Sequence, residues 1–233
     1  MQPFIYITVF LGAFLSGLLV LLFKIEKRRL KLLLAFSGAF LFAISILHLI
    51  PGLYAGGSST VGIFILSGFF FQILLEFFSE GIEHGHTHVH GNASFPLAVL
   101  ISLCIHSFLE GMPLESTAAG YNKPLLTGIL LHNIPIAIAL MSLFVSSKVK
   151  RTAALTALFV FACMTPLGSM ASTFLGQYLG DTTIYFNRIM GFVVGIFLHI
   201  STTILFESSE NHRFNFIKFI AIIMGAVAAF MIL

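Results

Sequence analysis

Eight apolar runs divide almost the whole chain, and each is long enough to cross a lipid bilayer. They cover approximately residues 4–23, 32–50, 61–79, 94–115, 124–146, 152–176, 184–206 and 214–233. A membrane-spanning helix needs about 20 consecutive, mostly apolar residues. Within hydrocarbon a backbone must satisfy its own hydrogen bonds, and at this length only helices do so. The sequence therefore predicts an all-α polytopic membrane protein, a bundle of eight transmembrane helices.

Charged residues make up only 9% of the 233 residues, whereas a typical soluble domain has about 25%. The loops are short, so we expect one transmembrane domain over residues 1–233, in a plasma membrane or a bacterial inner membrane. The net charge of +3 is too small to indicate nucleic-acid binding, and the lipid bilayer is the expected partner. Cys104 and Cys163 lie inside apolar runs, which favours small hydrophobic side chains over a disulfide or a thiolate zinc site.

Lysine and arginine are concentrated in alternate loops. The first, fifth and seventh loops carry nine of them, whereas the second, fourth and sixth carry only Lys123 and Arg188. Basic short loops remain on the cytoplasmic side of a membrane. We therefore expect the odd-numbered loops in the cytoplasm and both termini on the extracytoplasmic side.

Ionisable side chains interrupt the fourth and fifth runs, where each is costly and therefore typical of a functional site. His106 and Glu110 are four residues apart, so a helix places them on one face. His132 lies at a similar depth, because consecutive helices run in opposite directions and rise about 1.5 Å per residue. The three side chains are thus expected to meet near mid-membrane, where nitrogen and oxygen donors could hold one divalent cation. The alternative is a His–Glu hydrogen bond that neutralises both groups.

Prolines accompany these residues in both runs. Pro113 and Pro135 lack a backbone N–H, so the carbonyls of Leu109 and Leu131 are expected to lose their helical partners. Interrupted helices near the midplane form ion sites in many transporters. A kink that serves packing alone is the other interpretation.

A histidine-rich stretch lies in the third loop, at about residues 80–93. His84, His86, His88 and His90 alternate with small or flexible residues and could gather round Zn²⁺, Cu²⁺, Ni²⁺ or Co²⁺ as neutral imidazoles. The expected orientation puts this loop in the cytoplasm, where it would be a weaker metal-binding segment. A merely solvated polar loop is the alternative.

Other ionisable residues lie nearer the ends of the runs. His48, Glu76, Glu80 and Glu207 are in such positions, where side chains are commonly solvated, and a role on an ion path is the alternative. His199 lies deeper, so it is either a metal ligand or a hydrogen-bonded interior histidine. His199 and Glu207 are therefore secondary candidates for metal binding.

Pairs of small residues occur in the sixth and seventh runs. Gly191 and Gly195 form a GxxxG pair, and Ser172 with Gly176 forms a similar pair. Such pairs let helices approach closely. They indicate either internal packing or the face of a homodimer.

Several motifs resemble those of the ZIP family of zinc and iron transporters. The family's fourth-span pattern His-Asn-x-Pro-Glu/Asp-Gly is echoed from His106 to Gly111, and its fifth-span pattern His-x-Ile-Pro from His132 to Pro135. The His-rich third loop also resembles the family, as do two further motifs: His48-Leu49-Ile50-Pro51 and Thr165-Pro166-Leu167-Gly168. The motifs follow one another in the family's order.

This resemblance implies a helical bundle whose fourth and fifth spans carry divalent metal toward the cytoplasm, with no required cofactor. Zn²⁺ is the expected ion, and Fe²⁺, Mn²⁺ and Cd²⁺ are alternatives. The chain departs from the family's pattern at Ser107, Asn133 and Ile136, and at Leu109, which replaces a proline. These departures predict one metal position rather than two, with Ser107 or Asn133 as a weak oxygen donor or a group that supports the ligands.

Two other functions use the same residues. An intramembrane zinc hydrolase could activate water with His106, Glu110 and His132, although no His-Glu-x-x-His helix occurs. A haem protein could use the two histidines as axial ligands. No Gly-x-x-x-x-Gly-Lys-Ser/Thr phosphate loop occurs either, so nothing suggests that the chain hydrolyses ATP.

Overall fold

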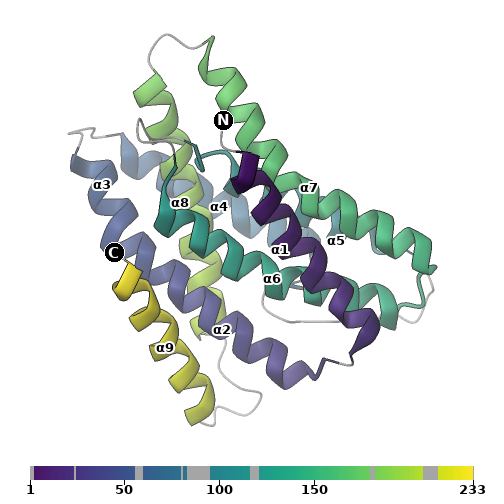
Figure 1. Cartoon of the computed structure of the whole chain (residues 1–233). Coiled ribbons are helices and arrows are strands. Elements are labelled where there is room, and N and C mark those ends of the chain that lie inside the picture. Colours follow the sequence, from purple (N-terminus) through teal and green to yellow (C-terminus); the bar gives the residue numbers. More distant parts are fainter. Residues whose placement is uncertain are drawn as a thin grey trace.

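The computed structural model describes residues 3–23, 25–55, 60–79, 81–82, 95–115, 121–178, 182–206 and 215–232. Within this part of the chain, eight helical rods form a bundle (Figure 1), which confirms the all-α prediction. Their bounds are α1 Pro3–Leu22; α2 Lys27–Ile44, continued by η1 Ser45–Leu49 and α3 Ile50–Ala55; α4 Val61–Ser79; α5 Leu97–Gly111; α6 Lys123–Ser146; α7 Arg151–Gly176; α8 Thr182–Phe206; and α9 Phe216–Ile232.

Six of these rods are long and apolar enough to cross a membrane, and α5 and α9 are shorter apolar helices of 15 and 17 residues. Large apolar side chains such as Leu22, Phe77 and Met231 are exposed on the outside of the bundle. A protein surrounded by lipid can expose such side chains, whereas a soluble protein rarely exposes extended apolar patches. The chain is therefore an integral membrane protein with several spans.

The second rod is longer than the apolar pattern predicted. It starts at Lys27 and continues past Pro51 to Ala55, because the segment Ser45–Leu49 is a π-helix. The Ile50 N–H reaches back five residues to the Ser45 carbonyl. This wider turn changes the local hydrogen-bond register just before the proline, so the helix is not ended there.

Helix α5 is shorter than predicted, because it ends at Gly111 just before Pro113. The following residues form tight turns, in which Met112 N–H donates to the Leu109 carbonyl at 3.1 Å and Leu114 N–H donates to the Gly111 carbonyl at 3.2 Å. The Leu109 carbonyl thus lacks the helical partner that Pro113 cannot supply, as expected, and accepts the Met112 N–H instead. Helix α6 instead continues through Pro135.

Glycines bring α5 and α7 into direct backbone contact. A Cβ atom on Gly111 would lie 2.9 Å from the Thr165 carbonyl carbon, and one on Gly168 would lie 2.8 Å from the Phe108 carbonyl carbon. Both distances are shorter than Cβ atoms tolerate, so each helix requires glycine opposite the other's backbone. The two contacts fix the relative position of the helices beside residues 107 and 165.

The GxxxG pair of α8 serves internal packing. A Cβ on Gly195 would lie 2.7 Å from the Phe69 backbone nitrogen of α4, and one on Gly191 would lie 3.3 Å from the Phe64 Cβ. In the sixth predicted run, Ser172 is buried and Gly176 lies against Phe186 of α8. Both pairs thus contact neighbouring helices of the same chain.

Helix α6 is the most enclosed rod of the described structure, and most of its side chains between Leu125 and Phe144 are buried. It contacts α1 and α2 on either side, as Figure 1 shows. Helix α5 contacts α4, α6 and α7. The polar residues of α5 and α6 therefore face the interior of the bundle.

Candidate metal centre

The polar residues of α5 share its buried face. Ser102, His106 and Glu110 are buried and four residues apart, which keeps them on one side of a helix, and the buried Ser107 is three residues before Glu110. The opposite part of α5 carries exposed apolar residues such as Ile101. Amphipathic spacing therefore directs the ionisable groups inward, away from lipid.

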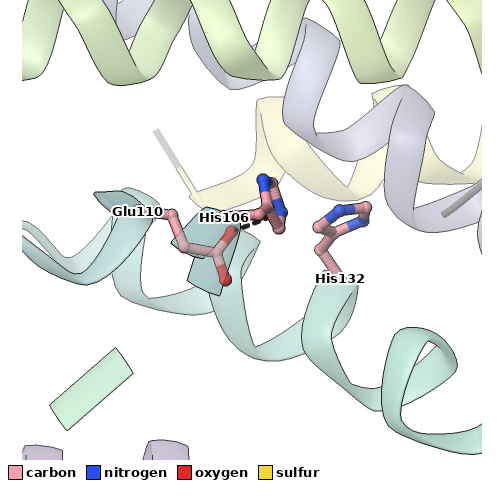
Figure 2. A group of neighbouring side chains, drawn as sticks. All are labelled: His106, Glu110 and His132. Atoms are coloured by element: carbon pink, nitrogen blue, oxygen red, sulfur yellow. Dashed lines mark ion pairs between the residues drawn. The ribbon is translucent and has the colours of Figure 1, made fainter. Parts of the chain in front are cut away.

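Three ionisable side chains converge between α5 and α6. His106 and Glu110 come from α5 and His132 comes from α6 (Figure 2), and the exposed fraction of each is 0%. His106 Nε2 lies 3.4 Å from Glu110 Oε2. The two imidazole rings are 5.8 Å apart between centroids and nearly perpendicular, at 80°. One ligand atom from each residue lies within 4.8 Å of the other two.

This arrangement fits a small divalent cation. Tetrahedral zinc with bonds of about 2.0–2.2 Å holds neighbouring ligand atoms about 3.3–3.6 Å apart. The His106–Glu110 separation of 3.4 Å already lies in that range. Two imidazole nitrogens and one carboxylate oxygen form a mixed donor set that suits zinc and related transition metals.

The Glu110 carboxylate gives the cluster its charge. Within the described residues neither of its oxygens has a hydrogen-bond partner, and the close contact with His106 Nε2 is the interaction of this carboxylate that we observe. The buried side chains of this part include no lysine or arginine. A buried carboxylate is costly unless it is neutralised, which a cation between Glu110 and the imidazoles would do.

A neutral cluster adjoins the three ionisable residues. Thr165 of α7 lies 2.8 Å from the Ser107 hydroxyl, and its oxygen accepts a hydrogen bond of 3.1 Å from the Asn133 amide nitrogen. All three side chains are buried. Ser107 and Asn133 are thus engaged with α7 through uncharged groups, and the cluster links α5, α6 and α7.

Gln72 of α4 is a further polar residue beside the centre, and none of the sequence motifs includes it. It is fully buried, and its Oε1 lies 3.3 Å from His106 Nδ1. The sequence does carry a signal, because Gln72 interrupts the apolar residues of the third predicted run. Thr165 did belong to one of the motifs, but the sequence did not show that it contacts Ser107 and Asn133.

The remaining described candidates do not belong to the group of three ligand residues. The His199 ring contacts the Glu76 carboxylate and lies edge-on to Phe69, with ring centroids 5.0 Å apart. His48 lines an open pocket of about 210 Å³ together with Asn122 and other residues. His199 and Glu76 belong to the interface of α4 and α8.

Ile136 supplies no ligand, being a fully buried apolar side chain one turn beyond His132 on α6. Glu115 accepts hydrogen bonds from the Tyr6 hydroxyl at 2.8 Å and from Thr173 at 3.3 Å.

Several predicted residues lie outside the described part of the chain, namely Glu80, His84, His86, His88, His90 and Glu207.

The comparison with protein families identifies the chain. A family model described as "ZIP Zinc transporter" matches residues 86–233, which is more than half of the sequence. The chain belongs to the ZIP zinc transporter family. No match was found among curated proteins.

Membership of the ZIP family decides between the functions that the sequence left open. The family consists of transporters, so the chain is a transporter of zinc or a related metal rather than an intramembrane hydrolase. The metal is the transported substrate, and the buried His–Glu–His group could hold it. The match gives no support to the haem alternative.

Proposed function

We propose that this ZIP protein carries Zn²⁺, or a similar divalent cation, through a site made by His106, Glu110 and His132. The observation that carries the proposal is the convergence of three metal-binding side chains from α5 and α6, all fully buried and within 4.8 Å. Their spacing already approaches that of ligands around one zinc ion. Binding would neutralise Glu110 without a lysine or arginine.

The site's modest charge supports transport rather than permanent storage. An ion must bind strongly enough to lose its water and weakly enough to leave again. One carboxylate and two neutral imidazoles leave a bound Zn²⁺ with a net charge of about +1. We therefore expect an intermediate affinity at a single metal position, with Ser107, Asn133 and Thr165 forming a neutral wall beside it.

The proposed direction is toward the cytoplasm. The basic residues of the odd-numbered loops support an orientation with both termini outside. Movement from the extracytoplasmic side is what the ZIP resemblance implies. The loop histidines at 84–90 would then meet the ion after it leaves the site.

Transport by purified protein in sealed proteoliposomes tests the proposal. His106→Ala, Glu110→Ala and His132→Ala should each greatly reduce Zn²⁺ flux, and double variants should cost little more than single ones, because the ligands act as a unit. Ser102→Ala is the matched control, since Ser102 is buried on the same helix but bonds the Leu75 carbonyl. Counterflow with Fe²⁺, Mn²⁺ and Cd²⁺ identifies the preferred ion.

Two results would contradict the proposed site. Normal Zn²⁺ flux in both Glu110→Ala and His132→Ala would show that the ion travels elsewhere. Equal loss in Ser102→Ala and the ligand variants would show that any polar deletion in α5 disrupts the bundle.

A further inference from the structure

A side chain of α4 reaches the proposed site from outside the two helices that form it. Gln72 lies on the buried face of α4, together with Gly68, Leu75 and Ser79. Its Oε1 is 3.3 Å from His106 Nδ1, and the opposite ring nitrogen, Nε2, is 3.4 Å from Glu110 Oε2. The His106 ring is therefore held between an amide on one side and the carboxylate on the other.

We propose that Gln72 is a positioning residue that fixes the tautomer and ring orientation of His106 for metal binding. The inference rests on the proposed function, because it assigns Gln72 a role toward the same site. A neutral imidazole carries one proton, and the nitrogen without it is the metal ligand. If Nδ1–H donates to Gln72 Oε1, Nε2 keeps its lone pair and faces Glu110.

The chemistry of metal-bound histidines supports this assignment. Such a histidine usually donates its other ring N–H to a carbonyl, carboxylate or water, which sets the tautomer and the ring angle. Gln72 supplies a carbonyl oxygen at the required nitrogen. The reverse amide orientation would donate N–H to Nδ1, place the ring proton on Nε2 and block the metal-facing nitrogen.

Gln72 is an amide and not a carboxylate, and this difference affects how tightly the metal is held. A carboxylate at this position would add a second negative charge beside His106 and make its ring a more basic ligand. The metal would then be held more tightly and released more slowly, which is unfavourable for transport. Gln72 thus orients the ring without adding charge. The residue also lies outside the stretch that matches the ZIP family, residues 86–233.

Three variants separate orientation from packing. Gln72→Met keeps an unbranched side chain of similar length but removes the acceptor, whereas Gln72→Glu retains an acceptor. Ser102→Ala is the control, since it removes a 2.7 Å hydrogen bond to the Leu75 carbonyl across the same α4–α5 interface. Zn²⁺ and Co²⁺ affinities are measured by equilibrium titration of purified protein.

We expect Gln72→Met to weaken metal binding by about 10–100-fold, the usual effect of losing such a partner. Gln72→Glu should bind at least as tightly as the natural protein but release Zn²⁺ more slowly in flux assays. Ser102→Ala should bind nearly normally. If Gln72→Met and Ser102→Ala weaken metal binding equally, Gln72 serves packing alone. If Gln72→Glu binds metal as weakly as Gln72→Met, the side chain at position 72 does not act as a hydrogen-bond acceptor.

Nitrogen NMR of ¹⁵N-histidine-labelled, metal-free protein provides a readout that packing alone would not move. His106, identified from the signal missing in His106→Ala, should carry its proton on Nδ1, and Gln72→Met should lower that population. A proton on Nε2 in the natural protein would overturn the proposal. The proposed metal site and the positioning role of Gln72 can fail separately. Normal metal binding by His106→Ala would contradict the metal site. Weakened metal binding by His106→Ala together with normal binding by Gln72→Met would contradict only the positioning role.

Discussion

The backbone contact between α5 and α7 predicts that Gly168→Ala disturbs the site from a distance. The added methyl group would lie 2.8 Å from the Phe108 carbonyl carbon, whereas ordinary contacts begin at 3.4 Å. The Phe108 carbonyl oxygen lies closer still to the added methyl group, so the helices must separate locally by more than about 0.6 Å. The 2.8 Å contact between Ser107 and Thr165 lies beside this point and would lengthen toward the limit of a hydrogen bond.

The energetic cost can be isolated with a second glycine. Overpacking of this kind costs about 1–3 kcal/mol, while replacing a helical glycine by alanine gains about 1 kcal/mol in helix propensity. Gly52→Ala is the matched control, because Gly52 is also helical and has no atom within 4 Å of the added Cβ. The propensity gain is common to both variants, so their difference should be about 1–3 kcal/mol.

Stability is measured by unfolding in a denaturing detergent, with circular dichroism as the readout. Zn²⁺ flux is measured separately in proteoliposomes. Gly168→Ala should unfold more readily than Gly52→Ala and transport more slowly. Equal stability and equal flux in the two variants would refute the idea that direct α5–α7 contact holds the site in place.

Three further changes test other parts of the molecule. Replacing the four loop histidines between residues 84 and 90 by serine should lower weak metal binding, measured by titration, but leave substantial flux; abolished flux in folded protein would make the loop obligatory. Ile136→Glu adds a carboxylate one turn from His132 and should tighten Zn²⁺ binding and slow release, whereas unchanged affinity would mean that position 136 does not reach the ion. A single cysteine in the loop, without Cys104 and Cys163, should react only with cytoplasmic reagent, and labelling from outside would overturn the orientation.

The number and approximate positions of the helices could be predicted because lipid imposes a simple requirement on length and polarity. The ends were harder to predict where proline intervened. Pro51 ended the predicted second run, but the π-helix at Ser45–Leu49 lets the observed rod continue to Ala55. Pro113 had the opposite effect, because α5 ends before it.

The meeting of His106, Glu110 and His132 followed from helical periodicity and from equal depth in antiparallel helices. Periodicity and depth do not determine which other helices contact these three residues. Gln72 and Thr165 approach from α4 and α7, and those contacts depend on the glycine-mediated packing of α4 with α8 and of α5 with α7. A single sequence reveals a polar residue in an apolar run, but only the fold shows what it touches.

Zinc K-edge X-ray absorption on the purified protein tests the central claim most directly. With one equivalent of Zn²⁺, a site made by His106, Glu110 and His132 should give a shell of nitrogen and oxygen atoms at about 2.0–2.2 Å, with two imidazole contributions and no sulfur. His132→Ala should remove one imidazole contribution and weaken binding. A sulfur shell at about 2.3 Å, or a zinc spectrum that His132→Ala leaves unchanged, would contradict a site made by His106, Glu110 and His132.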